Sequence, residues 1–180
     1  SIESGGNYNT VVGDEAGTAI TTGADNTFYG YSAGAAVTTG TNNTIIGSLA
    51  GDALTVGTRN VAVGKSALSA DTQGSRSVAV GRSALQTQNF TSATNAYNVA
   101  VGDFAGFAVT TGVNNTIVGG LAGDAITTGD YNVALGMTTL STNTAANKNV
   151  AIGAQALADF NVTSDTDTYN VAVGYAAGAA

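Results

Sequence analysis

A five-residue motif constrains the fold of this chain more than any other feature. The motif has the form Asn-Val-Ala-Val-Gly, as at residues 60–64, and versions of it recur ten times, with start numbers that differ by 17 seven times and by 21 twice. A period this short indicates one solenoid turn per repeat, because two packed helices with their connecting turn need upwards of about 30 residues. The sequence therefore predicts an all-β, parallel β-solenoid of about ten turns. The repeats start at Asn9, Asn26, Asn43, Asn60, Ser77, Asn98, Asn115, Asn132, Asn149 and Asn170.

The repeats follow one another without a linker, so residues 9–180 are expected to form a single repeat domain. Residues 1–8 are interpreted as the end of a preceding repeat, because Tyr8 stands directly before a repeat, where Tyr97, Tyr131 and Tyr169 stand later. We therefore expect the chain to be a fragment of a longer protein.

Composition narrows the class of protein. Glycine supplies 25 residues and proline none, and only 9% of residues are charged, which excludes collagen and argues against a highly charged disordered tail. The net charge of -7 disfavours nucleic acid and anionic membrane surfaces as partners. Without cysteine there are no disulfides, and no apolar run approaches the ~18 residues of a membrane span.

Each repeat is numbered here from its first residue. Positions 2 and 4 carry Thr, Val, Ile, Leu or Tyr, and since residues two apart share one face of a strand, we expect both positions to face the core. Position 1 predicts a ladder in which each amide side chain bonds its neighbours above and below. The ladder consists of Asn9, Asn26, Asn43, Asn60, Asn98, Asn115, Asn132, Asn149 and Asn170. Position 5 predicts a corner that ends the strand, because glycine permits the backbone angles of a turn. These turn glycines are Gly13, Gly30, Gly47, Gly64, Gly81, Gly102, Gly119, Gly136, Gly153 and Gly174.

Position 9 divides the repeats into two kinds, six with glycine and four with leucine. In the glycine kind a second strand is predicted, as at residues 19–23 and 108–112, which gives two strands and two corners per turn. In the leucine kind position 12 is more polar, so we expect the leucine to fill the core from a different point. The order glycine, glycine, leucine, leucine with insertion recurs as a 72-residue super-repeat.

The only variations in length are four-residue insertions, within residues 88–97 and 158–169. Added length at the same point of every fourth turn predicts two loops on one side of the solenoid, where repeat proteins commonly carry binding features. Phe90 and Phe160 are taken as equivalent residues that either anchor these loops or form a contact surface, with the anchor favoured. The candidate loop contacts are Phe90, Tyr97, Phe160 and Tyr169.

Position 3 is apolar in all ten repeats, although neighbouring residues of a strand point to opposite faces. If positions 2 and 4 face the core, position 3 forms an apolar column that water would not tolerate, so we expect it to be buried against a sister chain. This reasoning predicts a side-by-side homotrimer. The expected subunit interface is Val11, Phe28, Ile45, Ala62, Ala79, Ala100, Ile117, Ala134, Ala151 and Ala172.

The run Asn-Val-Ala-Val-Gly with a following Ser-Ala or Ala-Gly resembles the head repeat of trimeric autotransporter adhesins. The run at residues 43–47, with Thr-Thr-Gly elsewhere in such repeats, is similar to repeats of bacteriophage tail fibres. The resemblance covers residues 9–180. It implies a left-handed parallel β-roll, three chains side by side, and a role in attachment on the exterior of a bacterium or virion. The usual adhesin head repeat is shorter than the repeats of this chain.

Residue types argue against catalysis. The chain has no histidine and no cysteine, which removes His-based triads, Cys nucleophiles and the usual zinc sites. Lys65 and Ser66 are adjacent, so in a strand they would face apart. Asp165 and Asp167 could share a face as carboxylate ligands, but a solvated loop is favoured. Asp52 and Asp124 occupy the same position in successive super-repeats, so we interpret them as surface residues repeated with the sequence and not as a paired catalytic site. No Gly-x-x-x-x-Gly-Lys-Ser/Thr phosphate loop occurs, and no enzyme activity, cofactor or metal is expected.

Three classes of function remain at this stage. The first is an extracellular attachment fibre that binds a cell-surface glycan or protein receptor; the second is a purely structural stalk or filament. The third is ice binding, suggested by paired threonines that could stack into ladders on an uncharged β surface. The pairs are Thr21-Thr22, Thr38-Thr39, Thr110-Thr111 and Thr127-Thr128.

Overall fold

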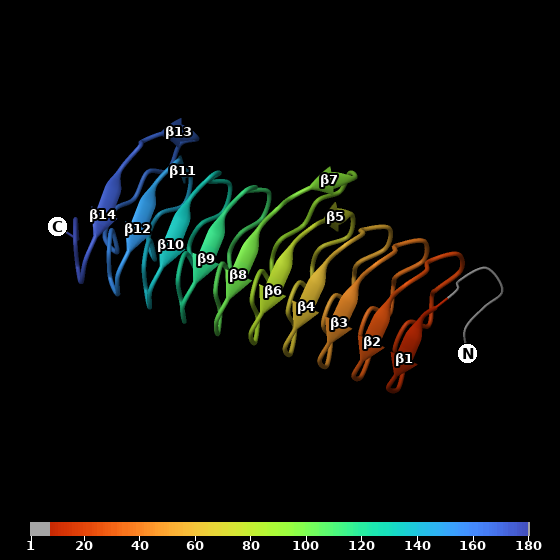
Figure 1. Cartoon of the computed structure of the whole chain (residues 1–180). Coiled ribbons are helices and arrows are strands. Elements are labelled where there is room, and N and C mark those ends of the chain that lie inside the picture. Colours follow the sequence, from red (N-terminus) through yellow and green to blue (C-terminus); the bar gives the residue numbers. More distant parts are fainter. Residues whose placement is uncertain (1–7, 180) are drawn as a thin grey trace.

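The computed structural model describes residues 8–179, which form a rod of ten stacked turns (Figure 1). Each turn contributes one three-residue strand to a single ten-stranded sheet, in which every strand pairs in parallel with that of the next turn. The described residues contain no helix. The predicted parallel β-solenoid is therefore confirmed, whereas the prediction for residues 1–7 lies outside the described part. The strands are β1 (Thr10–Val12), β2 (Thr27–Tyr29), β3 (Thr44–Ile46), β4 (Val61–Val63), β6 (Val78–Val80), β8 (Val99–Val101), β9 (Thr116–Val118), β10 (Val133–Leu135), β12 (Val150–Ile152) and β14 (Val171–Val173).

The register of the sheet keeps equivalent residues in line. Val11 lies beside Phe28 across a repeat of the ordinary length, and Val80 lies beside Val101 across a repeat that carries an insertion, so an insertion does not shift the pairing. Two small parallel sheets form where the insertions occur. One pairs β5 (Gly74–Ser75) with β7 (Thr94–Asn95), and the other pairs β11 (Ala146–Asn147) with β13 (Thr166–Asp167).

The orientation of the strands is opposite to the one expected from the sequence. Position 3, not positions 2 and 4, faces the core: Phe28 and Ile45 have no exposed surface, whereas their neighbour Tyr29 is 59% exposed. The placement of a subunit interface at position 3 is therefore wrong, because these side chains already pack inside their own chain. The residues concerned are Val11, Phe28, Ile45, Ala62, Ala79, Ala100, Ile117, Ala134, Ala151 and Ala172.

The predicted second strand of the glycine-kind repeats is also wrong. Residues 19–23 and 108–112 run as bends and open segments, although Thr21 N–H still donates to the carbonyl of Thr38 in the next turn. Short second strands occur instead at the insertions and in the turns that precede them. Only three residues of a 17-residue turn thus belong to the long sheet, and most of the rest form corners. The backbone of these corners still makes hydrogen bonds to the next turn, although it is not extended.

The predicted asparagine ladder is present, and its side chains from Asn9 to Asn132 make two kinds of bond. The side-chain oxygen of Asn26 accepts the backbone N–H of Asn43 at 2.9 Å, and Asn26 Nδ2 donates to the carbonyl of Gly40, near the end of its own turn, at 2.9 Å. Each of these asparagines therefore joins one turn to the next and also closes its own turn, whereas Asn149 Nδ2 donates to the carbonyl of Asn147 in the preceding turn. The corner glycines after the strands have φ between +123° and +140°, which a side chain would disfavour.

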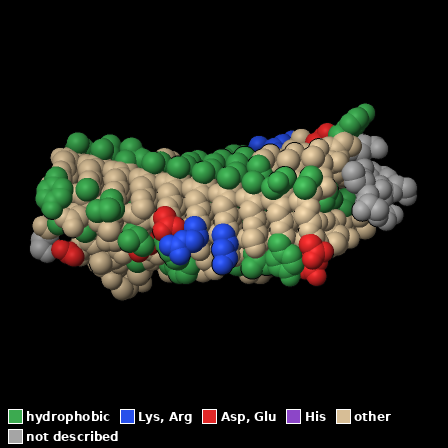
Figure 2. Space-filling model, turned by 90° about the horizontal axis from the view of Figure 1, so that it is seen from below, with side chains coloured by type: hydrophobic (Ala, Val, Ile, Leu, Met, Phe, Trp, Pro, Cys, Tyr) green, Lys and Arg blue, Asp and Glu red, His purple; other side chains and the backbone are tan. Residues whose placement is uncertain are grey.

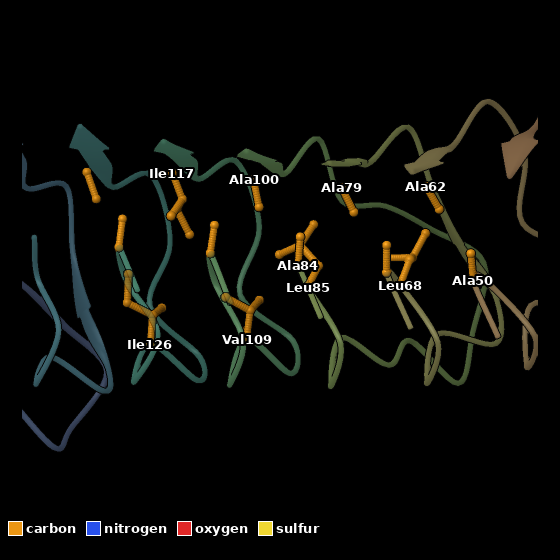
Figure 3. Close-up of a cluster of buried hydrophobic side chains, with 14 of the residues drawn as sticks. Ala50, Ala62, Leu68, Ala79, Ala84, Leu85, Ala100, Val109, Ile117 and Ile126 are labelled. Carbon is orange, nitrogen blue, oxygen red and sulfur yellow. The ribbon is translucent and has the colours of Figure 1, made fainter. Parts of the chain in front are cut away.

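The two kinds of repeat fill the core in complementary ways. A Cβ at Gly34 would lie 2.9 Å from Cζ of Phe28, and one at Gly51 would lie 2.9 Å from Cδ1 of Ile45. Glycine at position 9 thus makes room for a large residue at position 3. Figure 3 shows the other solution, in which the strand residue is alanine and leucine enters from the opposite wall. It labels Ala62, Leu68, Ala79 and Leu85, with Ile117 and Ile126 farther along.

Some repeats carry both a small position 3 and a glycine at position 9, and there the adjoining turns fill the space. A Cβ at Gly106 would lie 3.0 Å from Cδ2 of Leu85 and 3.1 Å from Cδ1 of Ile117. The core is therefore shared between consecutive turns, and the expectation that leucine fills it from another point is confirmed.

The asparagine ladder is interrupted once, at Ser77, and a buried polar network crosses the gap. Gln88 Nε2 donates to Ser77 Oγ at 3.0 Å and to Asp71 Oδ2 at 2.6 Å, while its Oε1 accepts from Asn98 Nδ2 at 2.9 Å. All four side chains are fully buried. Gln88 thus bonds the turns on either side of a position that lacks an amide.

Asp71 is the ionisable member of this network. Its Oδ1 accepts the backbone N–H groups of Gly74 at 2.9 Å and Phe90 at 3.2 Å. Burial raises the pKa of the Asp71 carboxyl above its usual value, and the hydrogen bonds from Gln88, Gly74 and Phe90 oppose that rise. The carboxyl therefore lies in the core with neutral donors only among its hydrogen-bond partners.

Candidate functional site: the outer sheet face and the two insertions

The outer face of the ten-stranded sheet is uncharged along its whole length and apolar at position 4 of every strand. It is formed by positions 2 and 4, which carry only Thr, Val, Ile, Leu and Tyr. Val118 and Tyr29 are 37% and 59% exposed, and Val173 in the last strand is 67% exposed. Figure 2 shows hydrophobic side chains following one another in rows along the rod. Parallel sheets are normally covered on both faces, so this outer face has the character of an interaction surface.

Two rows of corner residues border the outer face. The leading rim is the residue directly before each repeat, and the trailing rim is the residue directly after each corner glycine. The leading rim reads Tyr8, Asp25, Asn42, Arg59, Arg76, Tyr97, Asn114, Tyr131, Lys148 and Tyr169. The trailing rim reads Asp14, Tyr31, Ser48, Lys65, Arg82, Asp103, Gly120, Met137, Ala154 and Tyr175. All five cations of the chain therefore lie on these rims.

Both insertions protrude on one side of the rod, as predicted, with β7 and β13 standing off its body (Figure 1). Phe90 is only 7% exposed, and its N–H is bound by Asp71, so it anchors the first insertion. Phe160 is partly buried against the core. The two phenylalanines are not equivalent, however: one full super-repeat separates Phe160 from Gln88, and Val162 from Phe90. The predicted equivalence of Phe90 and Phe160 is therefore wrong.

Each insertion builds a cation–aromatic pair at the leading rim. Arg76 lies 5.5 Å from the ring centre of Tyr97, and its Nε donates to Asn95 at 2.9 Å. Four turns along, Lys148 lies 5.1 Å from the ring centre of Tyr169. Tyr97 and Tyr169, two of the predicted contact residues, are about half exposed or more, unlike the two phenylalanines.

The second pair is held by an acid. Asp167 Oδ2 accepts from Lys148 Nζ at 2.5 Å and from the Tyr169 hydroxyl at 2.8 Å, and these bonds hold the pKa of Asp167 below its usual value and that of Lys148 above it. In the first insertion Asn95 takes the place of Asp167. Both insertions therefore present a tyrosine beside a cation, which is Arg76 in the first and Lys148 in the second, but only the second adds a carboxylate.

The threonine pairs have a structural use. The hydroxyl of Thr21 donates to the carbonyl of Thr38 at 3.1 Å, and that of Thr127 donates to the carbonyl of Thr144 at 2.9 Å. The first threonine of each pair thus bonds the next turn. In every pair after the first, that threonine is half-buried and only the second, such as Thr39, is exposed.

Residues singled out for chemistry are dispersed over the rod. Lys65 is exposed on the trailing rim, beside Ser66 at a left-handed corner with φ 56°. Asp165 and Asp167 do approach each other, because both accept from Asn147 Nδ2, at 2.6 and 3.4 Å.

Asp52 and Asp124 lie four turns apart. Each has a buried side-chain oxygen without a hydrogen-bond partner, and burial raises the pKa of both carboxyls. Neither is near enough to the other for joint chemistry, since turns of a parallel solenoid are spaced by about 4.8 Å.

Residues 8–179 enclose no pocket, and they contain no group of three or more acidic, histidine or cysteine side chains placed to bind a metal ion. Within the same range there is no helix long and apolar enough to cross a membrane. The surface features that remain are the outer face, its rims and the insertions.

The chain matches no protein-family model, no curated protein and no solved structure.

Proposed function

We propose that this chain is a segment of an extracellular fibre that supports attachment to a cell surface, on a bacterium or a virion, without catalysis. The observation that carries the proposal is the pair of insertions, which stand off one side of a regular rod and each present a tyrosine beside a cation, four turns apart. Exposed tyrosines with a nearby cation are typical of surfaces that bind other molecules without a pocket.

The proposed receptor is a cell-surface glycan or protein. Tyr97 and Tyr169 are the proposed contacts, since Phe90 is used to hold its insertion in place. The different charge of the two insertions, with Asn95 in one and Asp167 in the other, would give the two contacts different preferences.

Self-association belongs to the same proposal. The resemblance to trimeric fibres implies three copies, and the outer face is now the surface available for them, because position 3 is used within the chain. Covering this face would remove apolar surface from water along all ten strands.

Replacement of the insertions tests the attachment function. In the test variant, residues 77–97 are replaced by a copy of residues 60–76, and residues 149–169 by a copy of residues 132–148, so that both insertions are lost and the turns are kept. We expect normal circular dichroism and loss of binding to whole cells and to glycan arrays. The matched control replaces residues 115–131 by a copy of residues 26–42, which leaves both insertions intact, and should bind as the wild type does. Undiminished binding by the test variant would show that the receptor contact lies outside the insertions, and absence of binding by the wild type would instead indicate a structural stalk.

A further inference from the structure

The charges on the two rims of the outer face are unevenly distributed. Strands β4 and β6 are each bordered by a cation on both rims: Arg59 and Lys65 flank β4, and Arg76 and Arg82 flank β6. Four of the five basic residues of the chain therefore lie around two adjacent strands, whereas the remaining strands have neutral, aromatic or acidic borders, with Lys148 beside β12 as the exception.

This distribution opposes parallel association of two copies in register. If the symmetry axis runs along the rods, whether two-fold or three-fold, the leading rim of one copy meets the trailing rim of the next at the same turn. Arg59 would then face Lys65 of the neighbouring copy, and Arg76 would face Arg82. Two like-charged pairs at every interface disfavour this arrangement.

An antiparallel arrangement removes both conflicts. A two-fold axis that runs along the strand direction, between β6 and β8, reverses one rod, so that each rim meets the same rim of the other copy. The first strand then lies opposite the tenth and the second opposite the ninth. On the leading rim Asp25 meets Lys148 of the second copy.

The centre of such an interface is also complementary. On the trailing rim Arg82 meets Asp103 of the second copy; within one chain these two already pair at 2.8 Å, so four alternating charges would surround the axis. On the leading rim Arg76 meets Tyr97 of the second copy, which repeats the cation–aromatic contact seen within the chain. Shifting the axis by half a strand spacing, onto β6 or onto β8, would place Arg82 opposite Arg82 of the second copy or Asp103 opposite Asp103.

Side-chain size on the outer face follows the same symmetry. Position 4 carries valine in the four central strands and in the two end strands, with larger residues in the two strands between them on each side of the centre. In the antiparallel pair, large residues therefore meet large ones and small meet small, along an even surface. The position 4 pairs would be Val12 with Val173, Tyr29 with Ile152, Ile46 with Leu135, Val63 with Val118, and Val80 with Val101.

The area available is sufficient for a specific contact. Ten strands spaced at about 4.8 Å, each about 10 Å long, give roughly 500 Å² per copy and about 1,000 Å² in total before the rims are counted. A stable biological interface needs about 1,000 Å² or more. A second copy also has the same spacing between turns, so its side-chain rows fit this face along the whole rod.

We propose that the outer sheet face binds a second copy of this chain as an antiparallel two-fold pair, with the axis between β6 and β8. This inference rests on the self-association in the proposed function, but it replaces the three copies implied by the resemblance with two, and it specifies their direction and register. It makes the outer face an interface that includes Tyr97, the last residue of the first insertion, and leaves the protruding strands β7 and β13 of each rod outside the contact.

The test uses two exposed residues that are far apart within one chain. Asp25 and Lys148 are separated by seven turns, or about 34 Å, so charge changes at these positions can couple only through another copy. The left-handed backbone at these positions accepts acidic and basic side chains alike, because Arg59 and Arg76 occupy the equivalent positions of other turns with similar φ. Mass is measured by light scattering coupled to size exclusion, and dissociation by dilution, for wild type, Asp25→Lys, Lys148→Asp and the double variant.

We expect the 17.6 kDa wild-type chain to form a species of twice that mass. Each single variant should dissociate roughly tenfold more readily at low salt, because two contacts per pair become repulsive. The double variant should recover the wild-type dissociation constant. In a separate experiment, a mixture of the Asp25→Cys and Lys148→Cys chains should form a disulfide between chains.

Other outcomes overturn the inference. A species of three times the chain mass, or a dimer in which the two charge changes have independent effects and the cysteines do not join, would show a different arrangement while leaving self-association in place. A monomer at ~100 μM, far above the dissociation constants of specific interfaces, would overturn self-association as well. The attachment function is judged separately, by the binding of the insertion variants.

Discussion

From Asn9 to Asn132, each asparagine of the ladder acts at two points of the fold. Asn43 accepts the N–H of Asn60 at 2.9 Å and donates to the carbonyl of Gly57 at 2.9 Å, all within the buried interior. Removing the amide leaves one backbone donor and one backbone acceptor without partners, which costs far more than the loss of a solvated bond.

We therefore expect Asn43→Ala to lower the free energy of unfolding by about 2–6 kcal/mol, because each of the two unsatisfied buried groups costs about 1–3 kcal/mol. Urea denaturation followed by circular dichroism measures the change. The matched control is the neighbouring Asn42→Gly, which alters an exposed residue with φ 59° and should be neutral or slightly stabilising. Equal effects at the two positions would contradict the role assigned to the ladder.

The buried Asp71 makes stability depend on pH. Its pKa is raised in the folded state by burial, so the folded chain binds the proton more tightly than the unfolded chain does. The stabilisation from this group is complete when the carboxyl is protonated, below the unfolded-state pKa, and is lost as the pH rises through the folded-state pKa.

We expect the melting temperature of Asp71→Asn, relative to wild type, to increase as the pH is raised from the usual aspartate value of 3.8. The comparison is the difference between the two proteins at each pH, measured by thermal melts. The reciprocal control is Asn143→Asp, at the equivalent buried position one super-repeat along, where Asn143 Oδ1 accepts the N–H of Ala146 as Asp71 Oδ1 accepts that of Gly74. The melting temperature of Asn143→Asp, relative to wild type, should decrease as the pH is raised. If the difference from wild type did not depend on pH for either variant, burial would not raise the pKa of a carboxyl at this position.

In most turns, the residues at positions 3 and 9 together fill the same part of the core. Gly51 with Ile45 is one solution and Leu68 with Ala62 is the other. The left-handed corner at position 9 accepts leucine, since Leu68 itself has φ 55°. It should therefore be possible to convert a turn that has glycine at position 9 and isoleucine at position 3 into one that has leucine and alanine there.

We expect Gly51→Leu alone to destabilise the chain by about 1–3 kcal/mol through overpacking against Ile45. Ile45→Ala alone should cost about 2–5 kcal/mol through the cavity that it leaves. In the double variant the new leucine occupies that cavity, so the total cost should fall short of the sum by about 1–3 kcal/mol. A double-mutant cycle in urea gives this coupling, and strict additivity would show that the two residues do not share a space.

The whole rod is held together by contacts between neighbouring turns, because each strand pairs only with the strands before and after it. Such a molecule has no contact between its two ends to lose when it is shortened. Its stability is close to a sum of turn and interface contributions.

Deletion of residues 98–169 should therefore leave a folded rod of six turns. The deletion joins Tyr97 to Asn170, and the same Tyr-Asn-Val-Ala-Val-Gly run stood at both places. We expect the circular dichroism per residue to be unchanged and the urea m-value to fall by about two fifths, in proportion to the residues removed. An unfolded product would mean that distant turns depend on one another.

The sequence by itself determined the period, the number of turns, the parallel sheet, the ladder and the side on which the insertions protrude. These properties depend on residues that recur at fixed spacing, and stacking identical turns brings equivalent residues into line whatever the details of each turn. Asn26 and Asn43 meet because they hold the same position in successive turns of equal length, and Gly30 is required by its positive φ.

The tertiary structure alone decided which face of the strands points inward. Positions 2, 3 and 4 are apolar or threonine in every repeat, so alternation along the strand carries no contrast between a buried and an exposed face. The deciding contacts come from the opposite wall, where Gly51 leaves room for Ile45 and Leu68 covers Ala62. The sequence does show that a large residue at position 3 goes with glycine at position 9, and that leucine at position 9 goes with alanine at position 3. That these two positions share one space follows only from the way the corner folds back over the strand, and this geometry is set by packing across the turn.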